Sequence, residues 1–172
     1  MRSNYREGRF TREEPSNWRD RSPAGPWHRE PDWAAWNDDY SGYDCAAQRN
    51  NSGAWCGYVF LPEGHPIDTP KKKSEPDDDG FEFGGDLTQG DPVWLDVHGG
   101  VTWHRGMDVP EAGLSGTAVG FDTAHSGDRS PTDGWAGGTY CDLEYVILEV
   151  TNMAEQISEY GRLEQLIQAG RE

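Results

Sequence analysis

One long apolar stripe near the end of the chain constrains the fold more than any other feature. Its residues recur at the i, i+3, i+4 and i+7 spacing of one helix face for four turns. The stripe consists of Leu143, Val146, Ile147, Val150, Met153, Ala154 and Ile157. Asp142 can cap the start of this helix, Glu144 suits its first turn, and Gly161 is expected to break it, with a short second piece at 163–167. The apolar face of such a helix is expected to pack on a sheet.

The segments before the helix contain several strand and turn signals. The predicted strands are 40–45, 55–61, 93–98, 101–103 and 117–122. Residues 50–53, Asn-Asn-Ser-Gly, are a turn signal, so the first two strands are expected to pair as a hairpin. Residues 104–117 and 126–139 are predicted to be loops. Because no strand–helix–strand alternation is visible, the predicted class is α+β: an antiparallel sheet of four to six strands against one long C-terminal helix.

The first part of the chain differs in composition from the rest. Residues 1–39 are rich in Arg, Trp and Pro and show no apolar period. They are therefore predicted to form a flexible arm whose tryptophans dock on the domain or on a partner. Residues 40–172 are predicted to form a single α+β domain. A charged insertion is expected at 68–91, where a lysine run is followed by an aspartate run.

The charge of the chain limits its partners. The formal net charge is -16, and most of the acid excess lies beyond residue 50. Such a field repels nucleic-acid phosphates, so direct binding to a nucleic-acid backbone is not expected. The sequence has neither an apolar leader nor the roughly 18 apolar residues in a row that a bilayer requires, so no membrane association is expected. Three cysteines, an odd count, are typical of free thiols in a reducing compartment.

Two segments break from apolar residues into glycine, histidine and aspartate, and they are the candidate functional segments. One contains His98 followed by two glycines, whose amides would be open to an anion. The other contains His125 with Asp122 and Asp128 three residues to either side, and either carboxylate can orient the ring. An imidazole titrates near neutral pH and can donate a hydrogen bond or act as a base. The alternative for both histidines is a structural role, bonded to an aspartate or to a backbone carbonyl.

The predicted ligand-binding site draws on both segments and on residues beside them. It comprises His98, Gly99, Gly100, Thr102, Trp103, Arg105, Asp122, His125 and Asp128. Arg105 and Arg129 are rare cations in an acidic half of the chain and favour an anionic ligand. Candidates for stacking on a planar ligand such as a base are Trp94, Trp103, Trp135 and Tyr140.

Metal binding and nucleophilic catalysis receive less support. Side chains of suitable types for zinc or manganese are His65, Asp96, His98, Asp122, His125 and Asp128. They follow no H-x-H or H-E-x-x-H spacing, and the cysteines are not at zinc spacing, so neither a metal nor another cofactor is predicted. Ser126 and Cys141 lie near His125 in sequence, but no nucleophile elbow and no glycine-rich phosphate loop is present.

Six short segments together resemble a family of small accessory proteins encoded by many bacteriophages. They are Tyr-Asp-Cys at 43–45, Trp-Cys-Gly-Tyr-Val at 55–59, Gly-His-Pro at 64–66, Asp-Val-His-Gly-Gly-Val-Thr at 96–102, Gly-Phe-Asp-Thr-Ala-His-Ser-Gly-Asp at 120–128 and Asp-Leu-Glu-Tyr-Val at 142–146. The resemblance covers about residues 40–160, and the arm and the charged insertion are departures from it. The family has no established activity, so the resemblance implies a phage origin and the cytoplasm of the infected host rather than a mechanism.

Three hypotheses for function follow. The favoured one is a binder, not an enzyme, that sequesters a nucleotide or another small anionic signal and so counters host defence; the role in counter-defence comes from the phage resemblance alone. The alternative is a hydrolase or phosphodiesterase acting on a nucleotide, with His98 and His125 as acid and base and Asp122 or Asp128 orienting them. The third is an acidic DNA mimic that acts as a decoy for a host protein. A homo-oligomer or a host protein partner is compatible with each hypothesis.

Overall fold

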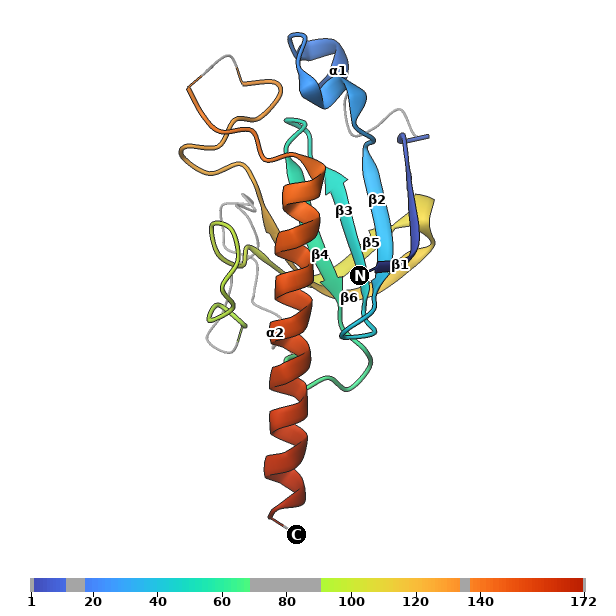
Figure 1. The fold of residues 1–172 in the computed structure, drawn as a ribbon, viewed down its shortest axis with the longest axis vertical. Helices are drawn as coiled ribbons and strands as arrows, with labels where there is room; N and C mark the ends of the chain where they lie inside the picture. Colours follow the sequence, from blue (N-terminus) through green and yellow to red (C-terminus); the bar gives the residue numbers. More distant parts are fainter. Residues whose placement is uncertain (1, 12–17, 69–90, 134–136, 172) are drawn as a thin grey trace, which may run out of the picture.

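The computed structural model describes residues 2–11, 18–68, 91–133 and 137–171. In these residues six antiparallel strands form one sheet, and one long helix packs against it (Figure 1), so the predicted α+β class is confirmed. The strands are β1 (Arg2–Gly8), β2 (Trp33–Asp38), β3 (Asp44–Arg49), β4 (Trp55–Phe60), β5 (Trp103–Val109) and β6 (Leu114–Asp122), and the long helix is α2 (Leu143–Ala169). The short helical turns are α1 (Trp18–Arg21), η1 (Pro26–Arg29) and η2 (Pro110–Ala112).

The sheet has the strand order β1-β2-β3-β4-β6-β5, and each neighbouring pair is antiparallel. β3 and β4 form a hairpin around the predicted turn at 50–53, although β3 shares only Asp44 and Cys45 with the predicted strand at 40–45. The Asn50 side chain closes the turn by accepting a hydrogen bond of 3.0 Å from the amide of Ala54. The sheet curls so that its two edges approach each other. Arg6 of the edge strand β1 donates a hydrogen bond of 2.7 Å to the carbonyl of Ala112, which follows the other edge strand, β5. Each face of the sheet carries its own apolar core.

The long helix begins where the sequence predicts. The Asp142 carboxylate caps it by accepting a hydrogen bond of 2.9 Å from the amide of Tyr145. Its apolar stripe is buried over β3 and β4, with Val150, Met153 and Ile157 fully enclosed. This core positions the first turns of α2 beside the ends of the sheet strands (Figure 1).

Gly161 does not break the helix, contrary to the prediction. α2 continues unbroken to Ala169. A Cβ at Gly161 would lie 2.7 Å from Nε2 of His65, whose buried ring packs against the helix at this point. The glycine therefore makes room for a side chain from another segment, and a helix with enough packing tolerates it at a cost of about 1 kcal/mol relative to alanine.

The first 39 residues differ from the expected flexible arm, as far as the structure describes them. β1 and β2 belong to the sheet and pair with each other. All four tryptophans of this segment are buried, and they are Trp18, Trp27, Trp33 and Trp36. The sequence lacks an apolar period here because the segment docks through separate large aromatics rather than through one continuous apolar face.

A buried cation holds this segment in place. The side chain of Arg49 has no exposed surface, and its Nη2 donates to Oε2 of Glu30 at 2.5 Å. Its guanidinium lies 4.9 Å from the ring centroid of Trp18 and 4.0 Å from that of Trp55. The Glu30 carboxylate also accepts a hydrogen bond from Tyr140. The ion pair and the stacked rings thus join the first segment to β3, β4 and the approach to α2.

Two further predictions about the middle of the chain are wrong. Residues 93–98 form an irregular segment rather than a strand. Their apolar alternation arises because Leu95 and Val97 are buried in the core beneath α2, while Val93 and Trp94 are exposed. Residues 104–117, predicted as a loop, contain most of β5 and the first part of β6; their exposed polar and glycine residues belong to an edge hairpin.

Parts of two other predicted segments fall outside the described residues. Residues 69–90 of the predicted charged insertion at 68–91 lie outside the described residues. The predicted loop at 126–139 is described except for residues 134–136, and it contains one isolated bridge between Asp128 and Thr139. Among the described helices, none combines the length and the apolarity that crossing a bilayer requires.

Candidate functional site

The first candidate segment is held against α2 by polar side chains of the helix. The main chain of Asp96 accepts hydrogen bonds from Asn152 at 3.1 Å and from Gln156 at 2.9 Å, and its amide donates to Gln156 at 2.9 Å. The amide of His98 donates to Oε2 of Glu149 at 2.7 Å. An irregular backbone needs such partners because no neighbouring strand supplies them. These bonds set the position from which the His98 side chain projects.

A buried pair anchors the start of the same segment. Nδ1 of His104 on β5 lies 2.5 Å from Oδ1 of Asp91, and both side chains are almost fully enclosed. Sequence reasoning missed this pair, because His104 falls within a stretch predicted to be a loop. The pair ties the segment to the edge strand at one end, while α2 holds it at the other.

The second candidate segment is a tight turn directly after β6. The Asp128 amide donates to the carbonyl of His125 at 2.9 Å, and the His125 amide donates to Oδ2 of Asp128 at 2.9 Å. Gly127 adopts a left-handed φ of 98° within this turn. The turn therefore presents the ring of His125 and the carboxylate of Asp128 on the same side.

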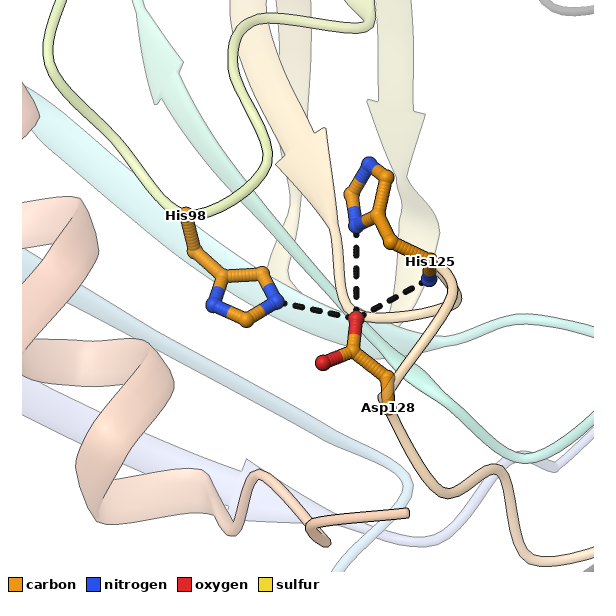
Figure 2. Close-up of side chains that lie close together, drawn as sticks. All are labelled: His98, His125 and Asp128. Carbon is orange, nitrogen blue, oxygen red and sulfur yellow. Dashed lines mark hydrogen bonds and ion pairs between the residues drawn. The ribbon is translucent and has the colours of Figure 1, made fainter.

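The two segments meet at the Asp128 carboxylate (Figure 2). Oδ2 of Asp128 lies 2.9 Å from Nε2 of His98 and 3.3 Å from Nδ1 of His125. The two imidazole centroids are 5.6 Å apart. One ligand atom from each residue lies within 4.8 Å of the others, and all three side chains are half-buried. We call these three residues the His98–His125–Asp128 cluster.

The electrostatics of the cluster keep Asp128 ionised. Burial alone raises the pKa of this carboxyl, but the hydrogen bonds from the His98 side chain and from the His125 amide outweigh it, so the pKa lies below its ordinary value. The carboxylate is thus a fixed negative charge between two imidazoles at neutral pH.

A second carboxylate lies at the edge of the cluster. Oδ1 of Asp122, at the end of β6, is 3.9 Å from Nδ1 of His125. The Asp122 side chain accepts hydrogen bonds of 3.0 Å from the Thr102 hydroxyl and from the Ala124 amide. Because both of its oxygens are bonded, its orientation is set independently of the cluster.

Sequence reasoning missed two site residues on α2. The Tyr145 hydroxyl lies 2.8 Å from Nδ1 of His98, and Glu149 holds the His98 amide. Burial raises the pKa of Tyr145, and the negative charge of Glu149 adds to the effect, so the hydroxyl stays protonated near neutral pH. The signal lay in a line of polar residues, Tyr145, Glu149, Asn152 and Gln156, which share one side of the helix next to the apolar stripe.

Cys141 lies on the far side of the Asp128 carboxylate. Its sulfur is 4.0 Å from Oδ1 of Asp128. Burial, together with the negative charges of Asp128, Asp142 and Glu149, raises the pKa of this thiol to about 11. A thiol held in this state is a poor nucleophile.

The structure brings together only part of the predicted site. His98, Asp122, His125 and Asp128 meet, Thr102 orients Asp122, and Gly99 lies against the ring of His125. The amide of Gly100 donates a hydrogen bond of 2.9 Å to the Val97 carbonyl and closes the turn after His98, so it is not open to an anion as expected.

The predicted cations and aromatics have other partners. Arg105 stacks on Trp103 at 3.9 Å, and that ring packs with the core on the face of the sheet away from α2. Arg129 stacks on Trp27 at 5.1 Å. Trp94 packs on Tyr160, and the Tyr140 hydroxyl accepts a hydrogen bond of 2.8 Å from Arg49. Trp135 is outside the described residues.

Comparisons with known proteins supply no further identification. No family model matches the chain, and neither the curated proteins nor the solved structures contain a match.

Proposed function

We propose that this protein binds a divalent transition-metal ion of the zinc type through His98, His125 and Asp128. The observation that carries the proposal is the convergence of Nε2, Nδ1 and Oδ2 of these residues within 4.8 Å of one another. The residues come from two segments far apart in sequence, which explains why motif spacing alone disfavoured a metal.

The distances support a shared ion. Tetrahedral zinc with ligand distances of about 2.0–2.1 Å holds adjacent ligand atoms about 3.4 Å apart. In the cluster the separations from Asp128 Oδ2 are 2.9 Å to His98 and 3.3 Å to His125. All three ligand atoms lie within 4.8 Å of one another, so the widest separation must shorten toward about 3.4 Å when an ion binds. Two imidazoles and one carboxylate are also a donor set that suits zinc and its neighbours better than magnesium or calcium, which prefer oxygen ligands alone.

The charge around the cluster supports a cation rather than a free anion. Asp122 lies against His125, and Glu149 holds the backbone of His98. The two arginines expected to attract an anionic ligand instead stack on Trp103 and Trp27. A dication would be attracted by this field, whereas a phosphate without one would be repelled.

The number of ligands bears on the class of function. Three protein ligands leave a position for water or for a small molecule, as in catalytic zinc sites; structural sites have four protein ligands. A bound ion of this type lowers the pKa of its water and polarises a phosphoryl or carbonyl oxygen. This supports the hydrolase hypothesis over sequestration, with the histidines as ligands rather than as acid and base. The nucleotide substrate, the phage origin and a role against host defence stay predictions.

The test is a titration of chelator-treated protein with Zn²⁺, followed by competition with a chromophoric chelator. We expect one ion per chain in the wild type. His125→Ala and Asp128→Asn should weaken binding by more than the roughly 10- to 100-fold that loss of an outer-shell partner costs. His28→Ala is the matched control, because His28 is exposed and its ring bonds to Ser22 instead.

Two outcomes would overturn the proposal: a wild type that binds no ion, or cluster variants that bind Zn²⁺ as the wild type does. If binding is found, nucleotides and cyclic dinucleotides incubated with the loaded and the metal-free protein distinguish the remaining hypotheses. Metal-dependent product formation supports a hydrolase, and recovery of intact bound ligand supports a binder.

A further inference from the structure

We infer that Tyr145 is the positioning residue of this site, and that its hydroxyl allows His98 to exchange its proton between ring nitrogens when a metal binds. The inference rests on the proposed metal function and deepens it. Its basis is the hydrogen bond of 2.8 Å between the Tyr145 hydroxyl and Nδ1 of His98, on the opposite side of the ring from Asp128.

The position of the tyrosine is built into the fold. Its amide is held by the N-cap Asp142 at 2.9 Å, so the first turn of α2 fixes its backbone. Its ring stands nearly perpendicular to that of His98, at 87° with centroids 5.5 Å apart. One turn later along α2, Glu149 binds the His98 amide at 2.7 Å. The same helix therefore holds both the backbone and the ring of His98.

The hydrogen bonds of His98 must differ between the metal-free and metal-bound protein. Because an ionised carboxylate can only accept, we assign Nε2–H as the donor to Asp128 in the metal-free protein, which leaves Nδ1 to accept from the Tyr145 hydroxyl. A metal ligand needs a free electron pair on Nε2, so the ring must carry its proton on Nδ1 instead. The step exchanges one tautomer for the other, since one proton leaves Nε2 and one is gained at Nδ1 through solvent.

A hydroxyl is suited to this exchange because it can donate or accept. It donates to Nδ1 in the first state and accepts from Nδ1–H in the second, with no movement of heavy atoms. A carboxylate at this place could serve only the second state, and an ammonium only the first. Tyr145 thus keeps the ring orientation constant in both states, which is the role of an outer-shell partner in a metal site.

The experiment compares Tyr145→Phe with wild type and with Tyr40→Phe. Tyr40 is the matched control, because it is also partly exposed and its hydroxyl also contacts α2 side chains, Glu159 at 3.5 Å and Arg162 at 3.4 Å. Zn²⁺ affinity is measured by chelator competition, the ligand field by the visible absorption of the Co²⁺-loaded protein, and folding by the melting temperature of the metal-free protein.

We expect Tyr145→Phe to weaken Zn²⁺ binding by roughly 10- to 100-fold and to change the Co²⁺ spectrum. The melting temperature of the metal-free variant should match the wild type, since the lost hydroxyl is partly exposed. Tyr40→Phe should behave as wild type in all three measurements. Wild-type affinity in Tyr145→Phe overturns this inference and leaves the metal site standing, whereas a wild type that binds no ion overturns both.

Discussion

Gly99 and His125 lie so close that a Cβ on the glycine would stand 2.1 Å from Cε1 of the imidazole. The two residues belong to the two segments that the sequence marks as candidate functional segments. Their contact brings the backbone after His98 against the ring of His125. It shows that the two segments are in direct contact, because no side chain larger than hydrogen fits between them.

Gly99→Ala should therefore abolish high-affinity metal binding. The new methyl would displace the His125 ring, in addition to the strain of a left-handed φ of 64°, which costs an L-residue about 1–2 kcal/mol. Gly113→Ala is the control, because it has a similar φ of 69° and open space around the missing Cβ. Both variants should lose similar stability from strain, but only Gly99→Ala should lose Zn²⁺. Equal Zn²⁺ affinities in the two variants would contradict the contact between the segments.

Removal of the buried cation should destabilise the whole protein. Arg49→Met leaves the Glu30 carboxylate without its charged partner in a mostly enclosed position, and such a loss costs about 3–5 kcal/mol. Urea unfolding measures this change. In the Arg49→Met background, Glu30→Gln should restore part of the lost stability, because it removes the unpaired charge. A single Arg49→Met variant as stable as wild type would show that the ion pair does not hold the first segment.

The packing of His65 on α2 predicts that Gly161→Ala lowers the free energy of unfolding in the wild type but raises it when His65 is removed. Gly161→Ala in the wild type places a Cβ 2.7 Å from Nε2 of His65, and overpacking of this kind costs about 1–3 kcal/mol. With His65→Ala in the background the clash is gone, and the same substitution should stabilise the helix by about 0.5–1 kcal/mol. Urea unfolding of the four proteins gives both values. Stabilisation in both backgrounds would show that the contact is not tight.

His65 should also make the stability depend on pH. Burial lowers the pKa of His65 below its ordinary value of 6.5. As the pH falls below 6.5, the unfolded chain takes up a proton that the folded protein resists. The free energy of unfolding should therefore decrease until the pH reaches the folded pKa. Between pH 7.5 and 5.5 the wild type should lose more stability than His65→Gln, as measured by urea unfolding. Parallel pH profiles would contradict this assignment.

The parts of the fold that were predictable are those whose signal is local. The spacing from Leu143 to Ile157 reports directly which helix face is buried, and the hairpin turn at 50–53 follows from its own residues. β1 and β2 were not predictable in this way. Their burial depends on Arg49 and on tryptophans that pack across long sequence distances, and neither leaves a periodic pattern.

In the candidate site, too, the local signals were predictable and the contacts between distant segments were not. His98, His125 and Asp128 stand out because polar residues follow apolar runs. The metal donor set they form was not visible, since motif spacing reports ligands on one element, and these come from two segments brought together by α2 and β6. Tyr145 was hidden because it lies on α2 beside the apolar stripe, and its partner His98 is far away in sequence.

The most direct measurement is a crystal structure of the protein grown with Zn²⁺, with anomalous diffraction recorded at the zinc edge. We expect one strong anomalous peak at about 2.0–2.2 Å from Nε2 of His98, Nδ1 of His125 and Oδ2 of Asp128. The Tyr145 hydroxyl should remain on Nδ1 of His98. A crystal without a peak at this cluster, or with zinc bound only elsewhere, would contradict it.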